Sequence, residues 1–395
     1  MKRYIEYGFI LSITFAAVIA CSKQDSIYKQ YVKSGGYDYP AKAIGLSYQA
    51  GYKNVIIKWE KPMDPSVLTA KLYWDNYSKS CDVNYSEHPD GKVEVPVDNL
   101  EDRSYTFDII NFDNNGNKSL PAEITVSPYG DGWMVSRAER SVLSAVMNGN
   151  DATVILTKST DEMVATKFRY LNRAGEWVEV KEHLLPGKDT IVFIDAMKGK
   201  RFEYSSSYCP KHGKDTVWRA WVKSFDGISY PLNGRRWSVS ATAGQIFDEN
   251  TPDKIFDGQN LSGFRYHSSK NEISKKIFPK IISIDTHTAA GEEFAFTGFK
   301  FCESPESANL RYIKDFMIYI GNSPYNPDEK EYEVKFGIPF IIGLLSKSEA
   351  EQTVWTTHGG VGRYLSIVFK DSWSPDGYID LWELIPYGYV PSQAD

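Results

Sequence analysis

Hydrophobic and polar residues alternate with a period of two along most of the chain after its first forty residues. In the stretch NVIIKWEKP, for example, Val55, Ile57 and Trp59 fall on one face. Similar short runs follow, each ended by a turn signal, the last of them being RSYTFDIINFDNNGNKSLPAEITVS. Because successive side chains of a strand point to opposite faces, this period predicts half-buried β-strands. We expect them to form a first β-sandwich over residues 41–127.

A second segment repeats this pattern roughly 110 residues later. DATVILTKS is similar to the first strand, ATKFRYLNRAGEWVEVK predicts a hairpin, and WRAWVKSFDGISYP parallels YTFDIINFDNNGNKSLP. The repeat predicts a second sandwich over residues 128–239. Near its start, GWMVSRAERSVLSAV has mixed apolar spacing that fits either a short helix or a strand.

The remaining residues, 240–395, predict a third β-domain of different character. It continues through KIISIDTHTAAGEEFAFTGFKFCES, IKDFMIYIGNS and GRYLSIVFKDSW, which do not repeat the pattern of the first two segments. The whole chain is therefore predicted to be all-β, with three domains in a row.

The N-terminus has the features of an export signal. Lys2 and Arg3 precede an apolar run of residues 9–20, which is shorter than the roughly 20 residues that a bilayer-spanning helix needs. Val18-Ile19-Ala20-Cys21 resembles a bacterial lipobox, in which the cysteine becomes the acylated first residue. We expect a signal peptide over residues 1–20, lipidation at Cys21 and a polar tether over residues 21–40. The alternative is a plain secretory signal with an incidental cysteine.

The two N-terminal segments resemble fibronectin type III sandwiches. Trp59 lies in an early strand, Tyr105 opens a late strand, and a D-x-x-G-x-x-S turn follows it. Paired modules of this kind also resemble the N-terminal part of surface lipoproteins in the polysaccharide-utilisation systems of Bacteroidota. The resemblance implies a stalk that holds another domain away from the membrane.

The third segment resembles the discoidin, or coagulation-factor type C, domain, a galactose-binding-like jelly-roll β-sandwich also found among carbohydrate-binding modules. The motifs that support this are, in chain order, Asp257-Gly258 with Tyr266 where a Trp is usual, FMIYIGNS, Arg363-Tyr364-Leu365, and Glu383-Leu384 through Tyr387-Gly388. The resemblance implies a carbohydrate-binding face. Tyr266 and the missing Asp after the middle strand depart from the family pattern and leave the ligand preference open.

The same resemblance implies a structural calcium site that closes the two ends of the domain together. Calcium takes six or more oxygen ligands, from side chains and from carbonyls. The matching positions are Lys254, Asp257, Gln259, Ser262, Trp382 and Glu383, with Lys254 and Trp382 contributing carbonyls. The alternative is a polar turn capped by Asp257, with Glu383 paired to a nearby cation, because Gln259 is longer than the family residue and uncharged.

Sugar binding requires aromatic faces that stack on a pyranose and planar polar groups that bond its hydroxyls. In discoidin-like carbohydrate modules these groups come from loops at one end of the sandwich. The candidate residues are His267, Tyr325, Trp355, Arg311 and Trp373.

Composition and motifs argue against several other functions. The formal net charge is -6 and no block of Lys or Arg exists, so nucleic acid is a poor partner. Cys81, Cys209 and Cys302 form no CxxC pair and indicate neither zinc nor disulfides. No HExxH, GxSxG or P-loop motif occurs, so we do not expect an enzyme.

The sequence thus predicts an outer-membrane lipoprotein, exposed at the cell surface, with two fibronectin III-like sandwiches followed by a discoidin-like domain. The expected function is non-catalytic binding of a polysaccharide or other glycan, alongside an outer-membrane transport complex. The alternative is a scaffold or adhesion protein whose partner is another protein.

Overall fold

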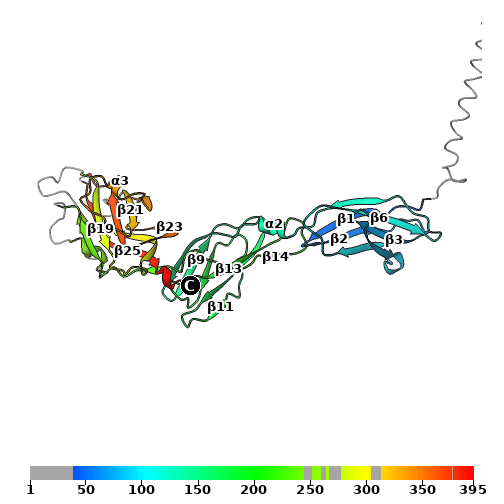
Figure 1. The fold of residues 1–395 in the computed structure, drawn as a ribbon, viewed down its shortest axis with the longest axis horizontal. Helices are drawn as coiled ribbons and strands as arrows, with labels where there is room; N and C mark the ends of the chain where they lie inside the picture. Colours follow the sequence, from blue (N-terminus) through cyan, green and yellow to red (C-terminus); the bar gives the residue numbers. More distant parts are fainter. Residues whose placement is uncertain (1–38, 244–250, 259–263, 267–276, 304–312, 376) are drawn as a thin grey trace, which may run out of the picture. The chain divides into compact units, whose positions relative to one another are not determined.

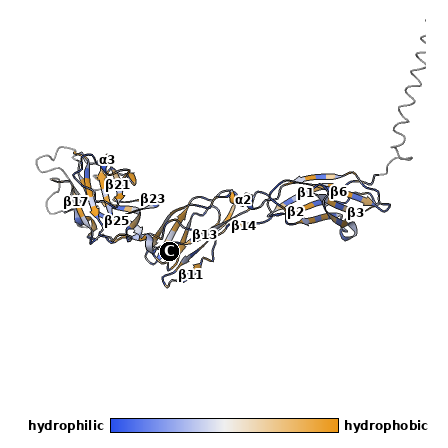
Figure 2. Ribbon diagram, in the orientation of Figure 1, coloured by the Kyte–Doolittle hydropathy of each residue, from blue (hydrophilic) through white to orange (hydrophobic). Residues whose placement is uncertain are grey.

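A computed structural model of the chain describes residues 39–243, 251–258, 264–266, 277–303, 313–375 and 377–395 (Figure 1). The predicted signal peptide, Cys21 and nearly all of the predicted tether lie outside the described residues. Nearly all regular elements of the described part are strands, and the predicted all-β fold is confirmed. Along strands such as β2 (Asn54–Glu60) and β5 (Lys92–Val97), buried apolar residues alternate with exposed polar ones (Figure 2).

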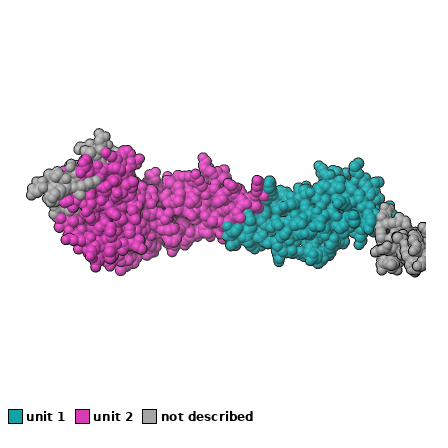
Figure 3. All heavy atoms as spheres, turned by 90° about the horizontal axis from the view of Figure 1, so that it is seen from above, with its two compact units in different colours: residues 1–136, 212–215 teal, residues 137–211, 216–395 magenta. Residues whose placement is uncertain are grey.

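The chain folds into two compact units (Figure 3). The first unit contains residues 1–136 and 212–215, and the second contains residues 137–211 and 216–395. No helix in the part that the structure describes combines the length and the apolar character needed to cross a bilayer.

The first unit is a sandwich of two antiparallel sheets, ordered β1-β2-β5 and β4-β3-β6-β7. Its remaining elements are β1 (Ile44–Gly51), β3 (Val67–Trp74), β4 (Lys79–Asn84), the 3-10 helix η1 (Tyr85–Glu87), β6 (Tyr105–Asp113), β7 (Ala122–Val126) and the short helix α2 (Asp131–Val135).

Trp59 and Tyr105 organise the core of the first unit. The indole N–H of the buried Trp59 donates to the hydroxyl of Tyr85 at 3.0 Å, and that hydroxyl donates to Asn111 Oδ1 at 2.8 Å. The backbone N–H of Glu101 donates to the Tyr105 hydroxyl at 2.9 Å, which is the corner expected where a late strand of such a sandwich begins. Because these buried polar groups have partners, the aromatic side chains fill the core without leaving them unpaired.

The second unit begins with another sandwich, whose sheets are ordered β12-β9-β8 and β11-β10-β13-β14, with β15 also paired to β13. Its strands are β8 (Val142–Asn148), β9 (Asp151–Leu156), β10 (Met163–Leu171), β11 (Trp177–Glu179), β12 (Thr190–Phe193), β13 (Glu203–Tyr208), β14 (Val217–Trp218) and β15 (Val222–Lys223). The stretch GWMVSRAERSVLSAV, which fitted either a helix or a strand, contains both. Its first residues belong to α2 and its last residues belong to β8.

The C-terminal sandwich completes the second unit with sheets ordered β16-β25-β20-β23 and β17-β19-β24-β21-β22. Strand β18 pairs with β25 outside that order. Its elements are β16 (Tyr230–Pro231), β17 (Ser238–Ala241), η2 (Pro252–Phe256), β18 (Phe264–Tyr266), β19 (Lys280–Asp285), β20 (Phe294–Glu303), β21 (Asp315–Gly321), α3 (Tyr332–Lys335), β22 (Ile341–Leu344), β23 (Glu351–Gly362), β24 (Tyr364–Phe369), β25 (Ile379–Tyr389) and η4 (Pro391–Gln393).

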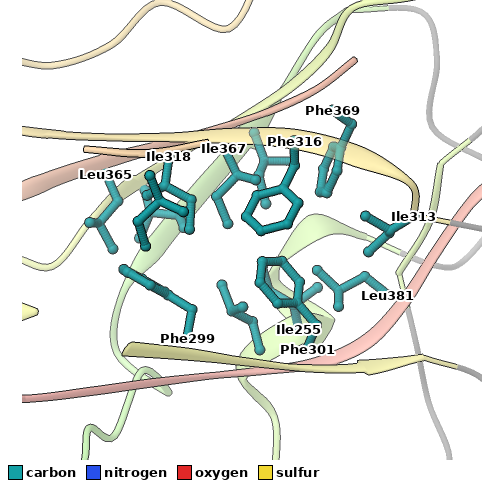
Figure 4. Close-up of a cluster of buried hydrophobic side chains, with 14 of the residues drawn as sticks. Ile255, Phe299, Phe301, Ile313, Phe316, Ile318, Leu365, Ile367, Phe369 and Leu381 are labelled. Atoms are coloured by element: carbon teal, nitrogen blue, oxygen red, sulfur yellow. The ribbon is translucent and has the colours of Figure 1, made fainter. Parts of the chain in front are cut away.

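Aromatic and aliphatic side chains from both sheets meet in the core of this sandwich. In Figure 4, Phe299 and Phe301 from β20 face Phe316 and Ile318 from β21, and Ile255 from η2 lies beside Phe301. The short helix before the Asp257-Gly258 turn is thus anchored by the core, which fixes the position of that turn.

The C-terminal sandwich uses residues that lie ahead of the expected start at residue 240. Tyr230 and Pro231 pair with Gly388 and Tyr387 of β25, and Ser238 begins a strand that pairs with β19. A chain cut at residue 240 would lose these strands from both sheets.

The chain end returns to the preceding sandwich of the same unit. Lys223 Nζ lies 3.1 Å from Asp395 Oδ1, and Lys200 Nζ donates to the Asp395 carbonyl oxygen at 2.6 Å. At the end of β25, the Tyr389 hydroxyl donates to Asp226 Oδ1 of the second sandwich at 2.7 Å. The two sandwiches of the second unit are therefore joined near the first and the last residues of the C-terminal sandwich.

We predict that Tyr389→Phe lowers the stability of the second unit by about 1–3 kcal/mol, because Asp226 loses a hydrogen-bond donor at a half-buried position. Calorimetry on the full chain resolves this, since the two units need not unfold together. Tyr364→Phe is the matched control, because no hydrogen bond from its hydroxyl is present among the described residues. Equal losses of stability in the two variants would contradict the stabilising role of the hydrogen bond from Tyr389 to Asp226.

Candidate functional site

A cavity of about 210 Å³ lies in the second unit between the edge strands β8 and β23, and we call it the cleft. Residues of the loop between β15 and β16 also line it. This loop is held against β8 by a hydrogen bond from the Ser229 N–H to the Ala145 carbonyl at 2.8 Å. Its lining residues are Ser141, Val142, Leu143, Ser144, Ala145, Val146, Tyr204, Phe225, Asp226, Gly227, Ser229, Thr297, Trp355, Thr356, Thr357 and His358.

Aromatic rings from both sandwiches line the cleft. Trp355 lies across Gly298 of β20 and packs against Tyr387 with ring centroids 4.9 Å apart, and a side chain at Gly298 would collide with the indole. Phe225 and His358 lie with ring centroids 4.4 Å apart. Phe225 is 66% exposed and Trp355 is 39% exposed, so both retain surface that a ligand can cover.

Polar groups of fixed orientation lie next to these rings. Asp226 accepts hydrogen bonds from the Tyr389 hydroxyl at 2.7 Å and from the Gly359 N–H at 3.2 Å. The Thr356 hydroxyl donates to the carbonyls of Thr297 and His358, at 3.0 and 2.8 Å. These bonds hold the β23 segment in place and leave further acceptor capacity on the Asp226 carboxylate.

The chemistry of the cleft suits binding better than catalysis. Asp226 is the one carboxylate among its lining residues, all of which the structure describes. Glycoside hydrolysis by the usual route needs two carboxyl groups that face each other across the substrate. Aromatic faces beside hydroxyl and amide groups are instead the arrangement that recognises a sugar.

Three tryptophans, Trp177, Trp218 and Trp221, lie close to two cations on the outer face of the β10-β13 sheet. Lys167 Nζ lies 4.7 Å from the ring centroid of Trp218 and 4.5 Å from that of Trp221. Arg169 lies 4.8 Å from Trp221 and 5.4 Å from Trp177. These cation–π contacts hold the indoles in place, and Trp177 remains 53% exposed.

The predicted ligand residues do not gather in one place. Trp355 lines the cleft. Tyr325 lies at another end of the C-terminal sandwich, half-buried against Phe336 with ring centroids 4.8 Å apart. The Trp373 indole N–H donates to the Leu345 carbonyl at 3.0 Å, away from both. His267 and Arg311 lie outside the described residues.

Tyr325 is chiefly a packing residue. Tyr319, Tyr332 and Phe336 surround it in a small aromatic cluster, and burial raises the pKa of its hydroxyl. Its edge borders a shallow hollow with Asn322 and Asn326. Tyr325 was expected to be a ligand residue, and its ring is half-buried by this cluster.

The structure brings together the Asp257-Gly258 turn and Glu383, which are far apart in sequence. The Gly258 N–H donates to Glu383 Oε2 at 3.2 Å, and the positive φ of Gly258 (75°) permits this turn. Burial raises the pKa of Glu383 to about 7, with the Asp257 charge adding to the increase and the Gly258 N–H and Arg235 opposing it. The buried carboxylate of Glu383 therefore lies near the half-buried Asp257 and the exposed guanidinium of Arg235.

This corner fits a hard cation in part. Asp257 and Glu383 supply charged oxygens, and the carbonyls of Lys254 and Trp382 belong to the same segments, although the Lys254 carbonyl already accepts the Asp257 N–H at 3.4 Å. No cluster of three or more His, Cys, Asp or Glu side chains occurs within the described ranges. Gln259 and Ser262, the other expected ligands, lie outside those ranges.

Phe225 and Asp226 were not identified from the sequence. They belong to the SFDGISYP stretch, which reads as a turn between strands of the second sandwich. The one signal in the sequence was an aromatic residue directly before an Asp-Gly pair. Their position beside Trp355, about 130 residues away in sequence, follows from the pairing of β16 with β25.

Comparisons with known proteins found one family model and a set of solved structures. A family model described as a domain of unknown function (DUF4998) matches residues 21–215, just under half of the chain. No curated protein matches the sequence.

Three solved structures are among those similar to the chain. A family 32 carbohydrate-binding module from C. perfringens NanJ, in complex with galactose, has 14% identity and a TM-score of 0.32, and the match covers 40% of this chain and 99% of that one. A SusE-like protein has 9% identity and a TM-score of 0.31, with 87% and 96% covered. A two-domain fibronectin type III segment of chicken tenascin has 12% identity and a TM-score of 0.22, with 47% and 100% covered.

We predict that the second unit loses stability as the pH rises from about 5 to about 7 in the presence of EDTA. The native pKa of Glu383, about 7, lies above its ordinary value of 4.5, so the folded state binds more protons in this window and folding weakens as they leave. Glu383→Gln removes this dependence, which calorimetry across the pH range measures. The exposed Glu292→Gln is the control, and equal slopes in the two variants would contradict the prediction.

Proposed function

We propose that this protein binds carbohydrate without catalysis, through the second unit. The observation that supports it is the cleft, where Trp355 and Phe225 present exposed aromatic faces next to Asp226 and His358. Stacking on the apolar face of a pyranose and hydrogen bonding to its hydroxyls both become available at one place. The single carboxylate in the lining supports a binding role over hydrolysis.

The proposed location is the outer membrane, facing outward, with Cys21 as the lipid anchor. The lipobox-like sequence supports this, together with a first unit that can separate the second from the membrane. Acyl chains contribute about 0.8 kcal/mol per buried CH₂, so lipidation would hold the chain by its first mature residue. A transport complex in the same membrane is the partner that a captured glycan would require.

We also propose that calcium binds at the Asp257 and Glu383 corner with a structural role. A divalent cation would offset the repulsion between two carboxylates at this buried position. The carbonyls of Lys254 and Trp382, with Gln259 and Ser262, would complete the oxygen shell. In the alternative arrangement, Arg235 alone balances the negative charges of Asp257 and Glu383.

A protein partner is the second candidate, and an apolar surface favours it. Ile342 and Leu344 of the edge strand β22 are exposed, and so are the neighbouring Val334 and Ile338, the last at 94%. Exposed apolar residues beside an unpaired strand edge are typical of protein docking. Binding of a protein partner that is lost on mutation of this edge and kept in Trp355→Ala would favour that candidate.

The first test is retention of the chain from Ser22 to Asp395 on polysaccharide affinity gels and glycan arrays. We expect retention on at least one glycan, and Trp355→Ala should weaken it about tenfold or more, equivalent to about 1.4 kcal/mol. Trp373→Ala is the comparison variant, because its indole lies outside the cleft. A folded wild-type chain that no polysaccharide retains would overturn the proposal.

For calcium, we expect added Ca²⁺ to raise the melting temperature of the second unit and EDTA to reverse the increase. Free calcium at 100 times Kd would stabilise the unit by about 2.7 kcal/mol. Asp257→Asn and Glu383→Gln should abolish the response, while Glu292→Gln should keep it. A melting curve unaffected by either addition supports the turn balanced by Arg235.

A further inference from the structure

We infer that the cleft is a composite site for a single neutral sugar residue, in which the second sandwich forms one wall. This inference rests on the proposed function and makes it more specific. It changes the expected role of the second sandwich from a spacer to a part of the binding site.

The two walls come from different sandwiches. Leu143 and Phe225 belong to the second sandwich, and Trp355 and His358 to the C-terminal one. Phe225 contacts His358 directly, and Asp226 accepts the N–H of Gly359. A sugar stacked on Trp355 would therefore contact groups that the C-terminal sandwich does not contain.

The walls are held at a fixed spacing. Ser229 and Thr297 hydroxyls lie 2.7 Å apart at the base of the cleft, and both residues are buried. The pairing of β16 with β25 and the contacts of Asp395 join the two sandwiches on either side. A preformed site avoids the cost of ordering its walls when the ligand binds.

The size of the cavity limits the ligand. Its volume, about 210 Å³, is below the roughly 300–1,000 Å³ typical of sites for drug-sized ligands. One pyranose ring fits this space, while a longer chain would have to continue outside it. The ligand is therefore the last residue of a glycan chain or of one of its branches.

The charges of the lining select against acidic sugars. No lysine or arginine is among the lining residues, all of which are described, and Asp226 contributes a carboxylate. A uronic acid would bring a second carboxylate beside it with no lysine or arginine to balance the pair. A neutral sugar can instead donate a hydroxyl to the acceptor sites that remain on Asp226.

The test titrates the chain from Ser22 to Asp395 with methyl glycosides of neutral hexoses and with the corresponding hexuronic acids, followed by ligand-observed NMR and tryptophan fluorescence. We expect at least one neutral glycoside to bind, and its uronic acid counterpart to bind at least about tenfold more weakly. Phe225→Ala and Leu143→Ala should weaken binding, the former about tenfold. Leu185→Ala is the matched control, since Leu185 is an exposed leucine of the same sandwich outside the cleft.

The outcomes separate the inference from the proposed function. Polysaccharide retention that survives Phe225→Ala but is lost in Trp373→Ala overturns the composite site and leaves carbohydrate binding intact. Retention of a polysaccharide without binding of any single glycoside overturns the one-residue site. Equal affinity for a hexose and its uronic acid overturns the charge argument. The absence of both kinds of binding overturns the proposed function and this inference together.

Discussion

The hydrogen bonds of Asp226 are the contact on which the second unit depends. This residue lies in a turn of the second sandwich, yet its donors, Tyr389 and Gly359, belong to two strands of the C-terminal sandwich. The following Gly227 lies against the backbone of Gly199 and the ring of Tyr389, where a side chain would collide. An Asp-Gly pair therefore serves here to bring two sandwiches together, beyond its ordinary role in reversing the chain.

The path of the chain adds further contacts between the two sandwiches. The chain enters the C-terminal sandwich through β16, which pairs with the last strand, β25, and leaves it through residues that bond to Lys200 and Lys223. Entry and exit are thus neighbours, and both are fixed to the second sandwich. Two further contacts lie at the cleft itself, from the Gly359 N–H to Asp226 and between the Ser229 and Thr297 hydroxyls, and they join its two walls directly.

The sequence predicts the strands well and the site poorly, for one physical reason. A period of two is a local property, so Val55, Ile57 and Trp59 reveal their strand without any knowledge of its neighbours. The meeting of Phe225 with His358 depends on which strands pair across about 130 residues, which no local pattern encodes. The approach of Asp257-Gly258 to Glu383 is also distant, and it could be anticipated only from a family resemblance.

The positions of Glu383 and Trp355 imply separate roles for the proposed calcium and the proposed sugar. Glu383 pairs with Cys302 of β20, while Trp355 pairs with Gly298 of the same strand. Four residues of extended strand span about 13 Å. Calcium coordinates oxygen at about 2.3–2.6 Å, so a cation at Glu383 could not contact a sugar stacked on Trp355. Its effect on binding would have to pass through the stability of the sheet that both residues share.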